Sequence, residues 1–179
     1  MRQKTMGRRL AVLLVLLSAV AIIAVQPATG GGAGAVIVRG DQLADTSGNP
    51  WDCLAGGPYE FPVYAMAGDL VGCWYTDTFE VRQANDNPGG SFKASGTEHF
   101  VGCLNTNGNM TCDPGEPYGR FATTFTFTAK LAPTGDEIHG RCQHPIVGGI
   151  DGFAGASGVI SFKDIPSEGR FPYHGNIKT

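Results

Sequence analysis

Residues 148–158 read Gly-Gly-Ile-Asp-Gly-Phe-Ala-Gly-Ala-Ser-Gly. Five of these eleven residues are glycine, and strand-like segments lie on both sides, at 137–146 and 158–164. Glycine adopts positive φ and lets backbones approach closely, so it is typical of tight turns and bulges rather than of strand interiors. Phe153 and Ala156 give the stretch an apolar face. The sequence therefore predicts a turn between two strands that folds back onto a hydrophobic core.

The segment 120–130 has the clearest strand pattern in the chain. Every second residue is apolar or β-branched, which places Phe121, Thr123, Phe125, Phe127 and Ala129 on one face. The other face carries Ala122 and three threonines. A period of two with aromatic and β-branched residues is typical of a half-buried strand. We expect the phenylalanine face to point into the core and the threonine face to point to solvent.

Strand-like segments recur along the chain, whereas no long window after residue 35 has helical periodicity. We predict eight strands, at 35–39, 60–67, 70–82, 91–104, 121–130, 137–146, 159–163 and 171–177. Asn, Asp, Pro and Gly fill the breaks between them, as turns require. Short strands with regular turns indicate an antiparallel barrel or sandwich. Because a closed barrel leaves no unpaired edge, we predict a single all-β domain folded as an antiparallel eight-stranded closed β-barrel.

The N-terminus has the layout of a secretory signal peptide. Four basic residues precede residue 10, an uncharged apolar run covers 10–25, and small residues follow up to Ala35. Ala33-Gly34-Ala35 fits a cleavage site of the A-x-A type. An uncleaved membrane anchor is the alternative, but the apolar run is short for a span of about 20 residues. We therefore predict a signal peptide over 1–35, a barrel domain over 36–179 and a secreted, extracellular protein.

Charge argues against two classes of partner. After residue 35 the chain carries 9 basic and 16 acidic residues, a net charge of −7. Neutralising phosphates needs clustered Lys and Arg, so we expect no nucleic-acid partner. The same charge opposes binding to anionic membrane surfaces after signal cleavage.

All five cysteines follow the predicted signal peptide, which places them in an oxidising compartment where disulfides persist. Five cysteines allow fifteen arrangements of two bridges. We prefer Cys53–Cys73 and Cys103–Cys112, since a turn-rich stretch brings Cys103 beside Cys112. Cys142 is then the free thiol, and Cys103–Cys142 is the main rival pairing. No Cys-x-x-Cys spacing supports a zinc or thioredoxin-like site.

Several motifs in order along 68–177 resemble the allene oxide cyclase barrels and, more distantly, the dirigent proteins. They are Gly68-Asp69-Leu70-Val71-Gly72, the aromatic strand 118–125, Glu137-Ile138-His139-Gly140, the glycine-rich stretch and Phe171-Pro172-Tyr173. The resemblance implies an eight-stranded barrel, and assembly into dimers or trimers; the sequence itself leaves the oligomeric state open.

Two positions depart from the family pattern. Asp151 stands where the family turn usually has Gly, although Asp tolerates a left-handed backbone better than most residues. Allene oxide cyclases carry a Glu on the first strand that is thought to act on substrate. Here residues 35–41 contain none, and the nearest carboxylate, Asp41, is expected in a loop. The resemblance therefore implies the fold more than the reaction.

Three residues are candidate catalytic groups. Cys142 and His144 share one strand face, and an adjacent imidazole can favour a thiolate nucleophile; the alternative is a buried Cys beside a packed His. Glu98 shares a face with Phe100 and Gly102, so it can point inward, where an apolar environment would raise the pKa of its carboxyl and suit it to acid–base work. The alternative for Glu98 is a solvated outer position.

Aromatic residues on the predicted strands are candidates for lining a ligand cavity, with core packing as the alternative. They are Tyr64, Trp74, Tyr75 and Phe125. The four histidines lack metal-ligand spacing, and residues 105–116 match a calcium loop only in part because Met110 occupies the position that requires Gly. We expect neither a metal nor a cofactor.

Three functions fit these features. The first is a secreted barrel that binds a small hydrophobic or phenolic molecule or serves as an extracellular interaction module. The second is an isomerase or cyclase that steers an apolar reactive intermediate, and the third is a purely structural extracellular protein. A barrel interior packed solid with side chains, without a cavity, would contradict the ligand-binding role.

Overall fold

The barrel is present in the computed structural model, which describes residues 34–43, 51–55, 57–84 and 89–179. The predicted signal peptide lies outside the described residues except for its last two positions. The described residues form eight strands and one short 3-10 helix, η1 (Pro166–Glu168). The strands are β1 (Val36–Leu43), β2 (Val63–Gly68), β3 (Leu70–Ala84), β4 (Ser91–Leu104), β5 (Tyr118–Leu131), β6 (Glu137–Asp151), β7 (Ser157–Asp164) and β8 (Phe171–Lys178).

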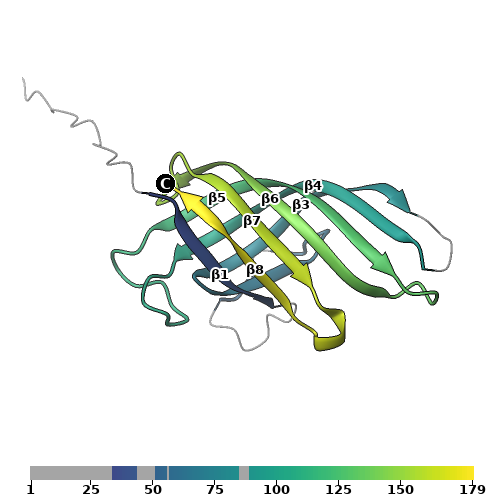
Figure 1. Ribbon diagram of the computed structural model, residues 1–179. Coiled ribbons are helices and arrows are strands. Elements are labelled where there is room, and N and C mark those ends of the chain that lie inside the picture. The colour runs from purple at the N-terminus through teal and green to yellow at the C-terminus, as the bar shows by residue number, and fades with distance from the viewer. Residues whose placement is uncertain (1–33, 44–50, 56, 85–88) are drawn as a thin grey trace, which may run out of the picture. The chain divides into compact units, whose positions relative to one another are not determined.

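Each strand pairs antiparallel with the next, and β8 pairs with β1 to close the barrel (Figure 1). The predicted all-β class and closed eight-stranded antiparallel barrel are therefore confirmed. The alternation along β5 is confirmed as well, since Phe121, Thr123 and Phe125 are buried whereas Thr124 and Thr126 are exposed. Inward-facing residues of all eight strands fill one interior, as the period of two requires.

The glycine-rich stretch differs from the prediction in one respect. Its first residues continue β6 to Asp151 instead of leaving the sheet at residue 146. Gly148 and Gly149 pair with Ala122 and Phe121 of β5 after a bulge at Val147, which has no partner in the register. The bulge lets β6 bend and stay paired, because one extra residue is absorbed without breaking the ladder. The turn itself occupies only 152–156.

Phe153 anchors this turn inside the barrel. Its side chain is fully buried and its ring lies 5.1 Å from Phe121 and 6.0 Å from Phe100. Glycine is required at position 149, where a Cβ would lie 2.3 Å from the carbonyl oxygen of Phe153. Asp151 has φ 55°, and no other described residue except glycine has positive φ. The expected fold-back onto the core is thus confirmed, and Asp151 does adopt the left-handed backbone.

The barrel interior has a packed half and an open half. In the packed half, Trp74, Phe100 and Phe121 are fully buried and in mutual ring contact, and the buried ring of Phe153 contacts the last two. Tyr173 also closes this core, since its hydroxyl accepts a hydrogen bond from the amide of Leu70 at 2.8 Å. The opposite half, toward the β3–β4, β5–β6 and β7–β8 turns, is not filled and contains the cavity described below.

Both preferred disulfides are present, Cys53–Cys73 and Cys103–Cys112, and Cys142 is free and buried. The rival pairing of Cys103 with Cys142 is thereby excluded. Cys53–Cys73 holds the segment before β2 on the outer face of the barrel, where Val63 and Ala65 form a second small core with the two sulfur atoms. Cys103–Cys112 joins the two ends of the predicted turn-rich stretch.

Candidate ligand-binding cavity

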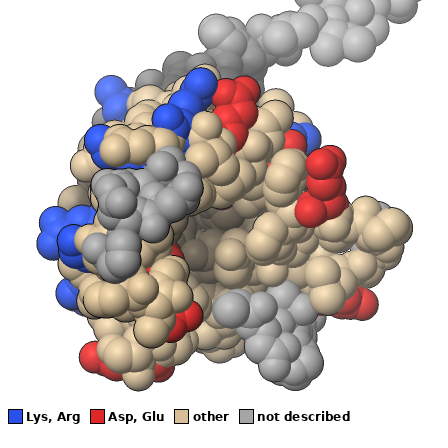
Figure 2. Space-filling view, turned by 90° about the vertical axis from the view of Figure 1, so that its right-hand side faces the viewer, with Lys and Arg blue, Asp and Glu red and all other residues tan. Residues whose placement is uncertain are grey.

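The open half of the barrel contains a cavity of about 160 Å³. Figure 2 looks onto the end of the barrel that carries the β3–β4, β5–β6 and β7–β8 turns, and the surface is hollowed at its centre. Aromatic rings form most of the wall, and a few polar groups interrupt it. The residues that line it are Gln42, Pro62, Tyr64, Thr76, Phe79, Glu98, Phe125, Phe127, Cys142, His144, Phe162, Asp164 and Phe171.

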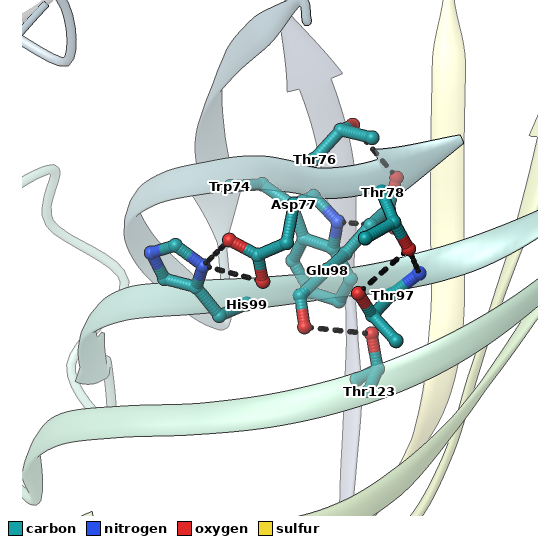
Figure 3. A network of polar contacts seen from close by, with 8 residues as sticks. All are labelled: Trp74, Thr76, Asp77, Thr78, Thr97, Glu98, His99 and Thr123. Carbon is teal, nitrogen blue, oxygen red and sulfur yellow. Dashed lines mark hydrogen bonds and ion pairs between the residues drawn. The ribbon is translucent and has the colours of Figure 1, made fainter. Parts of the chain in front are cut away.

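Glu98 on β4 is buried and points inward, the orientation that the sequence allowed as one of two. The indole Nε1–H of Trp74 donates to its Oε2 at 2.7 Å, and the hydroxyl of Thr76 donates to its Oε1 at 3.0 Å (Figure 3). These donors come from β3, which pairs with β4 in register at Thr76 and Glu98. Such charge-assisted hydrogen bonds are stronger than neutral ones, so they hold the carboxylate in place.

His144 on β6 completes the site from across β5. Its Nε2 lies 2.7 Å from Glu98 Oε2 and 3.3 Å from the sulfur of Cys142. A carboxylate can only accept, so the Nε2–H donates to Glu98, and in the neutral imidazole Nδ1 is then an acceptor. Nδ1 is buried and has no hydrogen-bond partner among the described residues. Thr76, Glu98 and His144 together form the polar floor of the cavity.

Aromatic rings fix the orientation of His144. Trp74 and Phe162 contact the imidazole edge to face, with centroids at 5.2 and 4.7 Å, and Phe125 lies at 5.9 Å. The ring is therefore clamped on several sides in addition to its bond to Glu98. A clamped imidazole with one free nitrogen is a defined recognition point rather than a mobile side chain.

Cys142 faces the cavity beside His144, as the strand period predicted. Burial raises the pKa of its thiol strongly, and the negative charges of Glu98 and Asp164 raise it further. The thiolate is the nucleophilic form of cysteine, so this environment favours a neutral thiol. Cys142 therefore suits packing and weak hydrogen bonding better than nucleophilic catalysis.

A second pair of acids lies where the cavity opens. Asp164 ends β7 and lines the cavity, and Glu137 at the start of β6 shares a hydrogen bond with it. Burial raises the pKa of Glu137 to about 7, and the negative charge of Asp164 adds to this. Burial also raises the pKa of Asp164. Glu137 and Asp164, named here the acidic rim, are therefore joined by the proton that Glu137 keeps below about pH 7.

The predicted ligand-lining residues divide into three groups. Tyr64 and Phe125 line the cavity, and burial raises the pKa of Tyr64 so that it stays a neutral phenol. Trp74 lies one layer deeper and supports Glu98 instead of lining the wall.

Tyr75 is a correction: it lies on the outer face of the barrel, stacked on His99 at 4.8 Å and tilted against Tyr59 at 5.2 Å. Adjacent strand residues face opposite sides, so Trp74 and Tyr75 cannot both point inward. Figure 3 shows His99 beside Asp77, away from Glu98; its Nδ1 lies 2.8 Å from the carboxylate.

Asp41 is also placed differently from the expectation. It lies within β1, which runs on to Leu43, and its carboxylate is 3.3 Å from the guanidinium of Arg170. Gln42 is the β1 residue that lines the cavity. The strand continues because β8 pairs with it up to Gln42, a long-range constraint that local polarity does not reveal.

Sequence reasoning missed several polar or aromatic groups of the site, among them Thr76, Glu137, Phe162 and Asp164. The two-residue period contained a signal for the last two, because Ile160, Phe162 and Asp164 alternate along β7. Glu137 could not be found in this way, because it begins its strand and its burial depends on its neighbour Asp164.

Comparison with protein-family models, with curated proteins and with solved structures finds no match to this chain. The likeness to allene oxide cyclase and dirigent barrels therefore stays a prediction from the sequence motifs. Within the described residues, no three or more His, Cys, Asp or Glu side chains gather in a way that would hold a metal ion. Nor does any helix there have the length and hydrophobicity to span a bilayer.

Proposed function

We propose that this protein is a secreted barrel that binds a small hydrophobic or phenolic molecule in its interior cavity. The observation that carries the proposal is an aromatic-walled cavity above a polar floor. Apolar cavities of about 150 Å³ take up benzene-sized molecules, which is close to the 160 Å³ found here. Ligand sites are typically apolar with a few well-placed polar groups that set orientation.

The polar floor supplies one specific contact for such a ligand. Glu98 already accepts hydrogen bonds from Trp74, Thr76 and His144. The free acceptor is His144 Nδ1, which a phenolic or alcoholic hydroxyl can satisfy. A hydroxyl that bonds to Nδ1 removes the cost of leaving this buried acceptor unpaired. A ligand with a hydroxyl group at that place should therefore bind more tightly than the same ligand without it.

Secretion fits the same proposal. Two disulfides are compatible with an oxidising, extracellular location, and the signal-peptide pattern at the N-terminus supports export. Cleavage after Ala35 would leave the barrel strands intact because β1 begins at Val36. Mass spectrometry of the protein from the culture medium of its host tests this part directly.

The test of ligand binding is calorimetric titration with 4-ethylphenol. A ligand of this size should bind with a dissociation constant of roughly 0.01–1 mM. Gln42→Phe adds a ring at the cavity wall and should abolish binding, whereas Thr124→Phe adds the same ring to the outer face and should leave it unchanged. Absence of binding to the wild-type protein, or equal binding by both variants, would contradict the proposal.

An isomerase or cyclase is the second candidate, favoured by the Glu98–His144 pair itself. Nδ1 of a neutral imidazole can take a proton from a bound ligand, and Glu98 at 2.7 Å would stabilise the imidazolium that results. The aromatic wall of the cavity provides apolar surroundings for such a step, and the shape of the cavity steers it. Only His144 and Glu98 are required for this role; the neutral thiol of Cys142 is not.

Deuterium exchange at the carbon next to the carbonyl of phenylacetone, followed by NMR in D₂O, tests this base function. The wild-type protein should accelerate exchange over buffer, and His144→Ala and Glu98→Ala should each lose the acceleration. Thr124→Ala on the outer face is the control and should retain it. If deuterium exchange with the wild-type protein ran only at the buffer rate, catalysis of this kind would be ruled out. Ligand binding would then remain as the proposed function.

A further inference from the structure

The cavity is acidic as well as aromatic. Its lining contains the carboxyl groups of Glu98 and Asp164, and none of the described residues that line it is a lysine or an arginine. Glu137 adds a third carboxyl group through its hydrogen bond to Asp164. His144 is the one basic group of the lining, and it is already paired with Glu98. An anionic ligand would therefore meet unbalanced negative charge, which is costly away from bulk water.

Glu98 and Asp164 differ in how far neighbouring groups already compensate their negative charge. Glu98 already accepts from three donors, two on Oε2 and one on Oε1, one of which is the imidazole of His144. Asp164 shares a hydrogen bond with Glu137, another acid, and no lysine or arginine among the described cavity-lining residues balances its charge; only His144, which is paired with Glu98, acts on it as a cation. A positively charged group would complete this rim as a salt bridge does, because an opposite charge close by stabilises a carboxylate.

Aromatic faces around the rim favour the same charge. Tyr64, Phe127, Phe162 and Phe171 line the cavity together with Asp164. The π-face of an aromatic ring attracts ammonium groups, most strongly when water is excluded. A carboxylate and the π-face of an aromatic ring both attract a cation and both repel an anion.

An unpartnered buried atom gives an independent sign of a ligand. His144 is 4% exposed and lines the cavity, and its Nδ1 has no partner in the described part of the chain. His144 pairs with Ile160, four residues before Asp164 on β7. The polar floor and the acidic rim are therefore two separate polar points along one aromatic wall.

We propose that the ligand is a small aromatic amine, whose ring fills the cavity, whose ammonium group pairs with Asp164 at the acidic rim and whose hydroxyl, where it has one, donates to His144 Nδ1. This inference rests on the proposed binding function and adds the chemical class of the ligand. The same charges that select the amine disfavour phenolic acids and fatty acids.

Binding of a cation at Asp164 affects the proton that Asp164 shares with Glu137. The raised pKa of Glu137, about 7, depends in part on the negative charge of Asp164. The ammonium group neutralises that charge and lowers the pKa, so the complex releases a proton near neutral pH. The other titratable groups that face the rim are Tyr64 on β2, Glu98 on β4, and Cys142 and His144 on β6; β5 and β8 contribute only phenylalanines to the cavity wall.

Three probes with one ring system test the proposal by calorimetric titration: tyramine, 4-ethylphenol and 3-(4-hydroxyphenyl)propionate. They carry a cation, no charge and an anion on the same phenol. At about pH 8 the wild-type protein should bind tyramine about tenfold more tightly than 4-ethylphenol, and the propionate about tenfold more weakly. Tyramine affinity should fall a few-fold at about pH 6, where Glu137 keeps its proton.

Asp164→Asn is the decisive variant, and Asp136→Asn in the exposed β5–β6 turn is its control with the same change in net charge. Asp164→Asn should remove the preference for tyramine while 4-ethylphenol binds as before; Asp136→Asn should leave both unchanged. Equal binding of tyramine and 4-ethylphenol by the wild-type protein, or a preference that survives in Asp164→Asn, would overturn the inference and leave the proposed function intact. Failure of all three probes to bind would instead overturn both.

Discussion

Glu98 accepts three hydrogen bonds inside the barrel and connects β3, β4 and β6 through its side chain. Removing it would leave the indole N–H of Trp74 and the imidazole of His144 buried without an acceptor. The cost of stranding such donors is several times larger than the net gain of one hydrogen bond. The position is therefore structural as well as chemical, and stability and binding must be measured separately.

We predict that Glu98→Ala lowers the free energy of unfolding by about 3 kcal/mol, because it breaks a buried charged network. Urea unfolding followed by circular dichroism measures this change. Glu80→Ala on the outer face, where the side chain is 61% exposed in its pair with Arg82, should cost less than about 0.5 kcal/mol. Similar losses in the two variants would show that the network does not support the fold.

Asp151 holds the left-handed conformation at the end of β6, with φ 55°. A side chain there is strained unless it is Asn or Asp, and glycine carries no such strain. We predict that Asp151→Gly is more stable than Asp151→Ala by about 1 kcal/mol, despite the greater freedom that glycine gives the unfolded chain. Urea midpoints of the two variants decide this, and a more stable alanine variant would contradict it.

At the scale of elements, β6 and the turn after it close the packed half of the barrel. β6 remains paired with β5 through the bulge at Val147, and the turn then packs Phe153 edge to face against the stacked rings of Phe100 and Phe121. Phe153 thus completes the packed half from the end of the barrel that carries the β6–β7 turn. A turn that carries its own core residue contributes to stability far more than an exposed loop does.

Phe153→Ala should therefore cost about 3–5 kcal/mol, the usual loss for emptying a buried phenylalanine site. Ile150→Ala, three residues earlier and 58% exposed, is the matched control and should cost less than about 1 kcal/mol. Chemical denaturation of both variants provides the comparison. Equal losses would mean that the turn is not anchored through Phe153.

At the scale of the whole molecule, the closed barrel gathers acids from different strands into one water-poor space. Glu137 and Asp164 have raised pKa values mainly because of burial, so the folded protein binds protons that the unfolded chain releases. A raised acid pKa stabilises the folded state below the unfolded value and loses that contribution as pH rises through the folded value. For Glu137 the interval runs from 4.5 to about 7.

We predict that the stability of the wild-type protein falls between about pH 5 and about pH 7, relative to Glu137→Gln, and that the two profiles run parallel above about pH 8. Urea midpoints at unit steps of pH measure this. Backbone hydrogen bonds from Thr106 and Asp113 lower the pKa of Glu116. Its contribution to stability therefore has the opposite sign, and it is lost as pH falls below the interval given for Glu137. Parallel profiles across the whole range would contradict the burial of the rim.

The alternation of residues in the sequence was sufficient to predict much of this molecule. The period of two along 121–130 assigned the inner and outer faces, and the turn chemistry separated eight strands that the structure contains. The same rule placed Cys142, His144 and, as one of two options, Glu98 toward the interior. Local turn propensity also predicted the Cys103–Cys112 bridge. Each of these predictions depends on residues that are close together in the chain, so the sequence alone is sufficient for it.

Only the tertiary structure brought Glu98 to His144 and left a cavity beside them. The two residues lie on β4 and β6, which are separated by β5, so their contact depends on the register of two strand pairs and on the curvature of the closed barrel. The extension of β6 through Gly148 and Gly149 has the same origin, because pairing with β5 overrides the turn preference of glycine. The acidic rim forms because the register of the β6–β7 pair, with Gly140 opposite Asp164, places the start of β6 beside the end of β7. Sequence determines which way each side chain faces, and the register of the closed sheet determines which side chains meet.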